Sequence, residues 1–190
     1  MDELRWLCVF CGSGMGTNPA HAAAAADLGA HLASEGVGLV YGGAHVGLMG
    51  VIADAVLAGG GAVLGVIPEH LRDREIAHTG LTELQIVADM HERKRAMYAR
   101  ADAFCALPGG YGTFEEVFEA TTWNQLGLHE EMAVKPLVLL DVEGFWAPLH
   151  DFLDRAVDAG FVKSANRALV GQATSPAGVT DAARAQLAAS

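Results

Sequence analysis

The chain has 190 residues, of which 52% are hydrophobic and 18% are charged, and its formal net charge is -11. This composition excludes a disordered or fibrous chain, and the charge argues against a nucleic-acid backbone or an anionic membrane surface as the main partner, because both select basic patches. No apolar run approaches the roughly 18 residues of a membrane span, and the first residues lack the basic start of a signal peptide. We therefore expect a single cytoplasmic domain over residues 1–190.

Short apolar runs alternate with helical patterns along the chain. Because these runs are continuously apolar, we expect strands that are covered on both faces. Strand followed by helix, repeated about six times, is typical of a doubly wound parallel α/β sheet. The expected strands cover residues 7–12, 38–43, 62–68, 84–87, 103–109 and 136–141; the expected helices include 20–34, 48–58, 90–100 and 113–126, and a last surface helix lies within 175–190.

The first expected strand ends in CGSGMGTNP, residues 11–19. In a doubly wound sheet, ligands bind outside the carboxyl ends of the strands, so Gly12 and Ser13 are candidate ligand contacts. The glycines resemble a dinucleotide fingerprint, but Thr17 stands where G-x-G-x-x-G needs its last glycine. The second expected strand also ends without the Asp or Glu that binds a ribose. A nicotinamide cofactor is therefore not expected.

Cys8 and Cys11 form a C-x-x-C pair on that first strand. Residues three apart on a strand point to opposite faces, whereas a redox pair sits at the start of a helix. Together with Cys105 they make an odd number, which argues against a disulfide framework. Redox chemistry is the weaker interpretation, and core packing explains Cys105 more simply.

The second expected strand leads into GGAHVGLMG, residues 42–50. This loop has the glycine content of a phosphate loop, with Gly43 as a candidate contact, but it lacks the Gly-Lys-Ser/Thr of a Walker sequence. Nothing here supports ATP hydrolysis. Tight turns explain the glycines equally well, so both interpretations stay open.

A basic cluster lies in ADMHERKRAM, where Arg93, Lys94 and Arg95 are adjacent in a chain with only 12 lysines and arginines. They fall in the first two turns of a helix that begins with Asp89 as N-cap and Glu92 as its capping-box partner. Exposed cations near a helix N-terminus cost roughly 0.3–1 kcal/mol each, and a bound anion removes this cost.

Helical spacing places Met90, Arg93 and Lys94 on one face together with Met97, and Arg95 on another. A solvated basic face is the alternative to an anion site. Arg95 also occupies the second histidine position of an H-E-x-x-H zinc motif, so no metal site is expected.

The most informative stretch is PGGYGTFEE, residues 108–116. Pro108 ends a strand, three glycines allow a sharp turn, and Thr113 is expected as the N-cap of the next helix. Free backbone N–H groups and the positive end of the helix dipole form a ready phosphate site. Thr113 and Glu116 also have capping-box spacing, so mere helix punctuation is the alternative. We favour phosphate binding because an ordinary helix start does not need three glycines.

These segments together resemble the LOG ("lonely guy") family of cytokinin-activating phosphoribohydrolases, long mislabelled as lysine decarboxylases. The resemblance covers nearly the whole chain, and MHERK followed by PGGYGTFEE at this spacing is highly specific. It implies a Rossmann-like fold and a homodimer with active sites near the interface. It also implies hydrolysis of the N-glycosidic bond of N6-substituted AMP, or of AMP, without a cofactor. The other matching segments are VFCGS, LVYGG, GLMG, GVIPEHL, Arg74–Glu75, TTWNQLGLH, KPLVLL and GF.

Residue by residue, the resemblance gives catalytic roles to Arg93 and Glu116. Glu116 would stabilise an oxocarbenium-like state or hold the water that traps it. Arg93 would orient Glu116 or stabilise negative charge, since it is always charged. The implied substrate contacts are Glu75, Lys94, Gly110, Tyr111, Gly112, Thr113, Glu115 and Thr122, with Gly12, Ser13, Gly43 and Met90 as further candidates.

Two alternatives to this hydrolase remain. A pyridoxal-phosphate decarboxylase needs a Schiff-base lysine, and of the three lysines only Lys94 falls near the expected site. The stronger rival is a non-catalytic carrier of a nucleotide or of molybdenum cofactor, like related Rossmann-like proteins. Such a carrier needs the phosphate cradle but not Arg93 together with Glu116.

The sequence also departs from the family pattern in places. Gly14 stands where a second serine is common, and Ala44–His45 stand where Gly-Ser is common. Residues 130–134 form an apparent insertion, which we expect to lengthen a surface loop or adjust the dimer contact. None of these changes removes a proposed catalytic group.

Overall fold

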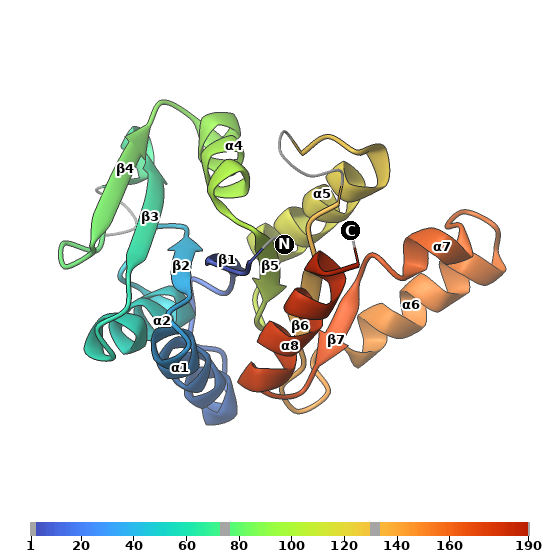
Figure 1. Cartoon of the computed structure of the whole chain (residues 1–190), viewed down its shortest axis with the longest axis horizontal. Coiled ribbons are helices and arrows are strands. Elements are labelled where there is room, and N and C mark those ends of the chain that lie inside the picture. The colour runs from blue at the N-terminus through green and yellow to red at the C-terminus, as the bar shows by residue number, and fades with distance from the viewer. Residues whose placement is uncertain (1–2, 73–76, 130–133, 190) are drawn as a thin grey trace.

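A parallel β-sheet organises the part of the chain that the computed structural model describes, which is residues 3–72, 77–129 and 134–189. Within these residues the sheet has seven strands in the order β4-β3-β2-β1-β5-β6-β7, and every neighbouring pair is parallel (Figure 1). The doubly wound parallel α/β fold is thereby confirmed. The strands are β1 (Trp6–Phe10), β2 (Gly38–Tyr41), β3 (Val63–Pro68), β4 (Glu83–Val87), β5 (Ala103–Ala106), β6 (Leu137–Leu140) and β7 (Gly171–Ala173).

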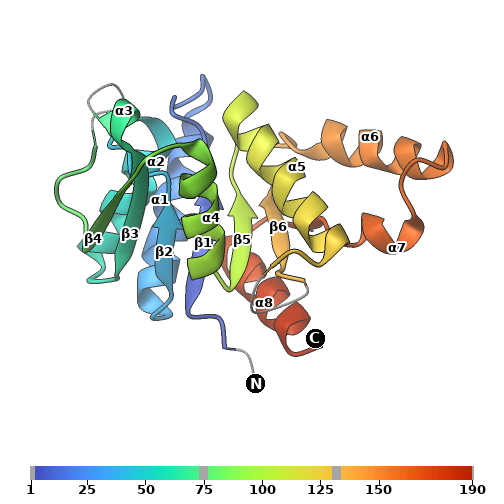
Figure 2. The same cartoon turned by 90° about the horizontal axis from the view of Figure 1, so that it is seen from above.

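Helices cover both faces of the sheet, as Figure 2 shows. On one face α1, α2 and α8 close a buried cluster that includes Leu28 and Ile52. On the other face α4, α5 and α6 pack around Tyr98 and Phe104. The helices are α1 (Pro19–Ser34), α2 (Gly47–Ala58), α3 (Glu69–Arg72), α4 (Met90–Arg100), α5 (Tyr111–Leu126), α6 (Ala147–Asp158), α7 (Ser164–Arg167) and α8 (Pro176–Leu187). None of these helices is long and apolar enough to cross a membrane.

The two outermost strands differ from the sequence prediction. We expected every strand to be covered on both faces, which is wrong for β4: only its last residue, Val87, is buried, and Ile86 is 48% exposed. β4 is an edge strand with one neighbour, β3. The opposite edge strand, β7, was not predicted because Gly171–Ala173 contains no apolar run; it pairs with β6.

The C-x-x-C pair is split between the two faces of the sheet, as predicted. Cys11 belongs to the cluster under α1 and α2, and Cys8 belongs to the cluster under α4 and α5. All three cysteines are free and buried. Burial raises the pKa of each thiol, so these side chains are packing groups rather than reactive thiolates.

The centre of the sheet is its topological switch point. β1 lies between β2 and β5, so the connections that leave β1 and β5 run to opposite sides. A crevice forms where such connections diverge, at the carboxyl ends of the two strands. This is the edge to which the glycine-rich loops after β1 and β5 belong.

Candidate active site

A cavity of about 190 Å³ opens at this switch point. The end of β1, the loops after β1 and β2, the first turns of α5 and single side chains of α2 and α4 form its walls. Eight of the predicted site residues line it: Gly12, Ser13, Arg93, Gly110, Tyr111, Gly112, Thr113 and Glu116. The sequence analysis did not name the other five as contacts of the site: Val9, Phe10, Cys11, Gly42 and Met49.

Main-chain contacts hold the loops of the cavity together. The Gly12 N–H donates to the Pro108 carbonyl at 3.1 Å, and the Leu48 N–H donates to the Gly12 carbonyl at 3.0 Å. A Cβ at Gly109 would collide with the Thr113 hydroxyl and would lie 3.0 Å from the Gly12 nitrogen. Glycine at 109 is therefore required for the β1 loop to meet the start of α5.

The start of α5 differs from the expected one in a way that matters for the site. Gly110 is the N-cap, no side chain caps the helix, and Thr113 is buried inside the first turn. The expectation that Thr113 is the N-cap is therefore wrong, because the helix begins at Tyr111, and the alternative capping box of Thr113 with Glu116 is not formed. The uncapped N–H groups and the dipole of a 16-residue helix point at the cavity.

Gly110 and Gly112 have no structural need to be glycine. Neither has a positive φ, and a Cβ at either position would meet no atom within 4 Å. What these two glycines provide is open space directly over the N-terminus of α5. An anion that approaches the backbone closely would use that space.

Arg93 enters the cavity from α4 and is held by main-chain oxygens. Asp89 caps α4, as predicted, by accepting from two N–H groups. The Arg93 side chain is only 6% exposed; Nε donates to the Val66 carbonyl at 3.1 Å and Nη2 donates to the Gly42 carbonyl at 2.9 Å. Met90 Sδ lies 3.7 Å from Nη1. A Cβ at Gly42 would overlap Nη2, so this glycine makes room for the guanidinium.

Glu116 lines the same cavity as Arg93, from the second turn of α5. Burial raises the pKa of its carboxyl to about 7, although the positive charge of Arg93 acts in the opposite direction. Glu115 and Glu119 add to the rise through repulsion. At neutral pH the side chain is therefore poised between acid and carboxylate, as a general base or acid should be.

Lys94 and Glu115 lie beside the cavity and do not line it. Lys94 Nζ donates to Glu115 at 2.7 Å and to Glu119 at 3.0 Å, and Glu119 also accepts from the Tyr98 hydroxyl at 3.0 Å. Burial alone would lower the pKa of Lys94, but its two carboxylate partners raise it. These hydrogen bonds join α4 to α5 beside the cavity.

The remaining predicted contacts are scattered. Gly43 adjoins the lining residue Gly42, and Met90 touches Arg93. Thr122 is exposed on α5, where its hydroxyl donates to the Phe118 carbonyl. Glu75 and most of the insertion at residues 130–134 lie outside the described residues.

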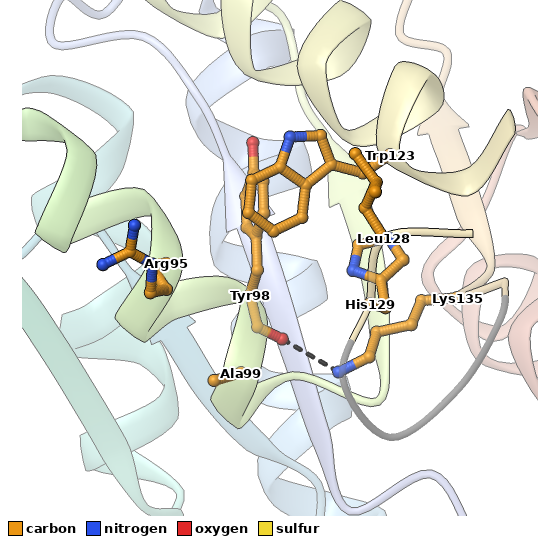
Figure 3. A pocket seen from close by; sticks show the side chains of 7 residues that line it. All are labelled: Arg95, Tyr98, Ala99, Trp123, Leu128, His129 and Lys135. Carbon is orange, nitrogen blue, oxygen red and sulfur yellow. Dashed lines mark hydrogen bonds between the residues drawn. The ribbon is translucent and has the colours of Figure 1, made fainter. Parts of the chain in front are cut away.

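A larger cavity, of about 320 Å³, lies between α4 and α5 (Figure 3). Its walls include Tyr98, Trp123 and His129, and Arg95 is directed away from these rings. Burial lowers the pKa of His129 to about 4, so the ring is neutral. Lys135 Nζ donates to the carbonyls of Tyr98 and Ala101. The described residues that line this cavity include no carboxylate, so it is a poorer reaction site than the one at the switch point.

Comparison with known proteins gives one family and one fold. A family model described as "Possible lysine decarboxylase" matches residues 49–183. The chain is 50% identical over 169 residues to the cytokinin riboside 5'-monophosphate phosphoribohydrolase LOG7 of Arabidopsis thaliana, covering 89% of this chain and 76% of that protein. It is also 50% identical over 164 residues to the probable enzyme LOGL1 of Oryza sativa subsp. japonica, covering 86% and 72%.

Solved structures with the same fold are more distant in sequence. The molybdenum cofactor carrier protein of Chlamydomonas reinhardtii superimposes with a TM-score of 0.71 at 23% identity, covering 98% of this chain and 99% of that one. The molybdenum cofactor binding protein of Rippkaea orientalis gives a TM-score of 0.71 at 21% identity, with the same coverage. These similarities establish the fold alone.

Proposed function

The chain belongs to the LOG family of cytokinin riboside 5'-monophosphate phosphoribohydrolases, and from this membership we propose its reaction. It hydrolyses the N-glycosidic bond of N6-substituted AMP, or of AMP, and releases the free base and ribose 5-phosphate. The observation that carries the proposal is that Glu116, with a pKa near 7, shares one cavity with the uncapped N-terminus of α5.

The phosphate binds at the start of α5. The N–H groups of residues 111–113 and the helix dipole favour a doubly charged anion over Gly110 and Gly112. This contact lies away from the bond that breaks, so its binding energy positions the ribose for reaction. A nucleoside without the phosphate loses that positioning and reacts much more slowly.

Glu116 and Arg93 act on the reacting atoms. When the C1'–N9 bond breaks, its electron pair leaves with the base and positive charge develops on the ribose, which the Glu116 carboxylate stabilises. Water then bonds to C1', Glu116 accepts its proton, and that proton is available to the departing base. The fixed charge of Arg93 stabilises negative charge on the base or phosphate.

The two alternatives are weaker. Pyridoxal-phosphate chemistry does not fit the residues present, because neither Lys94 nor Lys135 lines the cavity and both hold other protein groups, while Lys163 is exposed beyond α6. A carrier protein would have no use for a half-buried carboxylate with a raised pKa in the same cavity as Arg93. Relatives at 50% identity also outweigh carriers at 21–23%.

Homodimerisation is part of the proposal. Tyr111, Phe118 and Leu126 are 92%, 43% and 59% exposed and share one face of α5 with Thr122. Tyr111 also lines the cavity, so an interface on this face would lie next to the active site. This arrangement would give Thr122 a place near the partner's nucleotide.

The test is to incubate the protein with N6-isopentenyl-AMP, AMP and isopentenyladenosine and to separate free base by chromatography, with Glu116→Ala as control. We expect base from the two phosphorylated substrates and almost none from the nucleoside or the variant. Nucleotide binding without release of base would replace the hydrolase with a carrier.

A further inference from the structure

A histidine outside the cavity anchors the segment that follows α3. His78 is the one buried residue among residues 77–83, and its Nε2 lies 2.9 Å from Asp54 Oδ1 on α2. Its Nδ1 accepts the Gly80 N–H at 3.0 Å. The side chain therefore ties its own turn to α2, while the residues around it are mostly exposed.

These contacts determine the tautomer of the ring. The Gly80 N–H is a donor, so Nδ1 must offer its lone pair and the proton must be on Nε2, from which it is donated to Asp54. One possible metal-ligand atom from each of His45, Asp54 and His78 lies within 4.8 Å of the other two. A metal at Nε2 would move the ring proton to Nδ1, against the Gly80 N–H. The cluster is therefore a hydrogen-bonded clamp rather than an open set of metal ligands.

The turn that carries His78 contacts the loop after β2, and this loop binds the Arg93 side chain. The main-chain N–H of His78 donates to the Gly43 carbonyl at 3.0 Å, and Ala77 forms an antiparallel bridge with Ala44. Gly43 has a φ of +80°, which glycine adopts freely. Because glycine has so much conformational freedom, contacts with other segments must define the orientation of the adjoining peptide. The preceding carbonyl, that of Gly42, accepts from Arg93 Nη2.

We propose that His78 is a positioning residue for the reaction. Its ring holds the turn at residues 77–80, this turn holds Gly43, and the Gly42 carbonyl then fixes the guanidinium of Arg93 in the cavity. Asp54 has a positioning role as well, because it accepts the hydrogen bond from His78 Nε2. The inference rests on the proposed hydrolase function, in which Arg93 must face the reacting nucleotide.

Three variants and one matched control separate this role from general stability. In His78→Asn the amide oxygen still accepts from Gly80 but does not reach Asp54; Asp54→Ala removes the acceptor, and Asp54→Asn keeps it. The control is His31→Asn, which breaks a 2.9 Å contact between His31 Nε2 and Thr180 Oγ1 that joins α1 to α8 and involves neither α2 nor the turn at residues 77–80.

The kinetic result expected is a split between kcat and KM. His78→Asn and Asp54→Ala lower kcat on AMP by about 10–100-fold and change KM by less than about threefold, because misplacing a catalytic group costs this much while the phosphate site is intact. Asp54→Asn keeps near-normal turnover. His31→Asn loses thermal stability but not kcat.

A second readout does not require activity. The Nε–H of Arg93, bonded to the Val66 carbonyl, gives an arginine side-chain resonance in a 1H–15N spectrum, which Arg93→Lys assigns by its loss. We expect its hydrogen exchange to be at least about tenfold faster in His78→Asn and unchanged in His31→Asn.

The outcomes distinguish the two proposals. If the wild-type protein hydrolyses no nucleotide, the proposed function fails, whatever the spectra show. If the wild type is active and His78→Asn keeps either its kcat or its slow Arg93 exchange, the positioning role is overturned. The positioning role is supported if His78→Asn loses both its kcat and its slow Arg93 exchange, and if Asp54→Asn keeps the turnover that Asp54→Ala loses.

Discussion

Arg93 and Glu116 line one cavity from two helices, yet the Arg93 side chain donates to the Val66 and Gly42 carbonyls and to Met90 Sδ rather than to Glu116. The sequence left two roles open for Arg93, to orient Glu116 or to stabilise negative charge, and no hydrogen bond joins the two side chains in the described chain. The carboxyl is thus left without a strong partner for its charged form. This is why burial dominates and raises its pKa to about 7.

The first prediction concerns the pH dependence of hydrolysis. If Glu116 acts as a carboxylate, kcat/KM rises with pH through an apparent pKa of about 7 and falls about tenfold per unit at lower pH. Initial rates on AMP between pH 5 and 9 test this. A profile that is flat between pH 5 and 8 would contradict the assignment.

The second prediction concerns stability. The pKa of Glu116 is raised from 4.5 to about 7, so the native state binds this proton more tightly than the unfolded state does. Its contribution to the free energy of unfolding is present below about pH 4.5 and is lost as pH rises to about 7. Glu116→Gln should therefore be more stable than wild type at pH 8, by up to about 3 kcal/mol. Urea unfolding at pH 8 and pH 4.5 measures the difference, which should vanish at the lower pH.

Gly112→Ala tests the phosphate cradle. The added methyl group meets no protein atom within 4 Å, so the protein should fold with normal stability. We expect KM for AMP to rise at least about tenfold, because the methyl group occupies the space over the start of α5. Gly171→Ala, on the remote strand β7, is the control for folding and should leave KM unchanged. An unchanged KM in Gly112→Ala would show that the phosphate binds elsewhere.

Lys94→Met separates a structural lysine from a nucleotide contact. Lys94 is bound by Glu115 and Glu119 and does not line the cavity. We expect about 1–2 kcal/mol of lost stability, because Glu119 then keeps a partly buried charge without its cation, and little change in KM for AMP. Arg95→Met, at the exposed neighbouring position, should change neither. A large rise in KM for Lys94→Met would restore its predicted role as a substrate contact.

The proposed dimer predicts a clear effect at Phe118. Phe118→Asp puts a charge on the exposed face of α5 and should produce a monomer at micromolar concentration, measured by sedimentation velocity. Phe152→Asp on α6, where the ring is 60% exposed, is the matched control and should leave the mass unchanged. If the wild-type protein is a monomer under the same conditions, the proposed interface on α5 is contradicted.

Local sequence signals predicted the centre of the fold better than its edges. Continuous apolar runs identify β1, β2, β3, β5 and β6 because these strands are buried on both faces, whereas three residues of β7 carry no such signal. For the site, the glycines and charges after the strands indicated the right loops. Gly42 was not identified, because its role depends on Arg93, which lies 51 positions further along the chain.

The start of α5 shows why local rules can mislead. Thr113 and Glu116 have the spacing of a capping box, and nothing in the sequence alone distinguishes that role from the observed one. A contact distant in sequence and a local one surround this start: the Gly12 N–H donates to the Pro108 carbonyl, and the Thr113 side chain packs against Gly109, ahead of a helix that begins at Tyr111.

The central pairing of β1 with β5 also bears on how the protein acquires activity during folding. Leu7 pairs with Ala103, so about half of the chain lies between the two strands that frame the cavity. Long-range pairings of this kind form late, because the intervening loop must first lose its conformational entropy. Local units such as α1 with α2 can assemble earlier without any cavity. In a refolding experiment, catalytic activity should return with the slowest phase, well after most of the helical circular-dichroism signal.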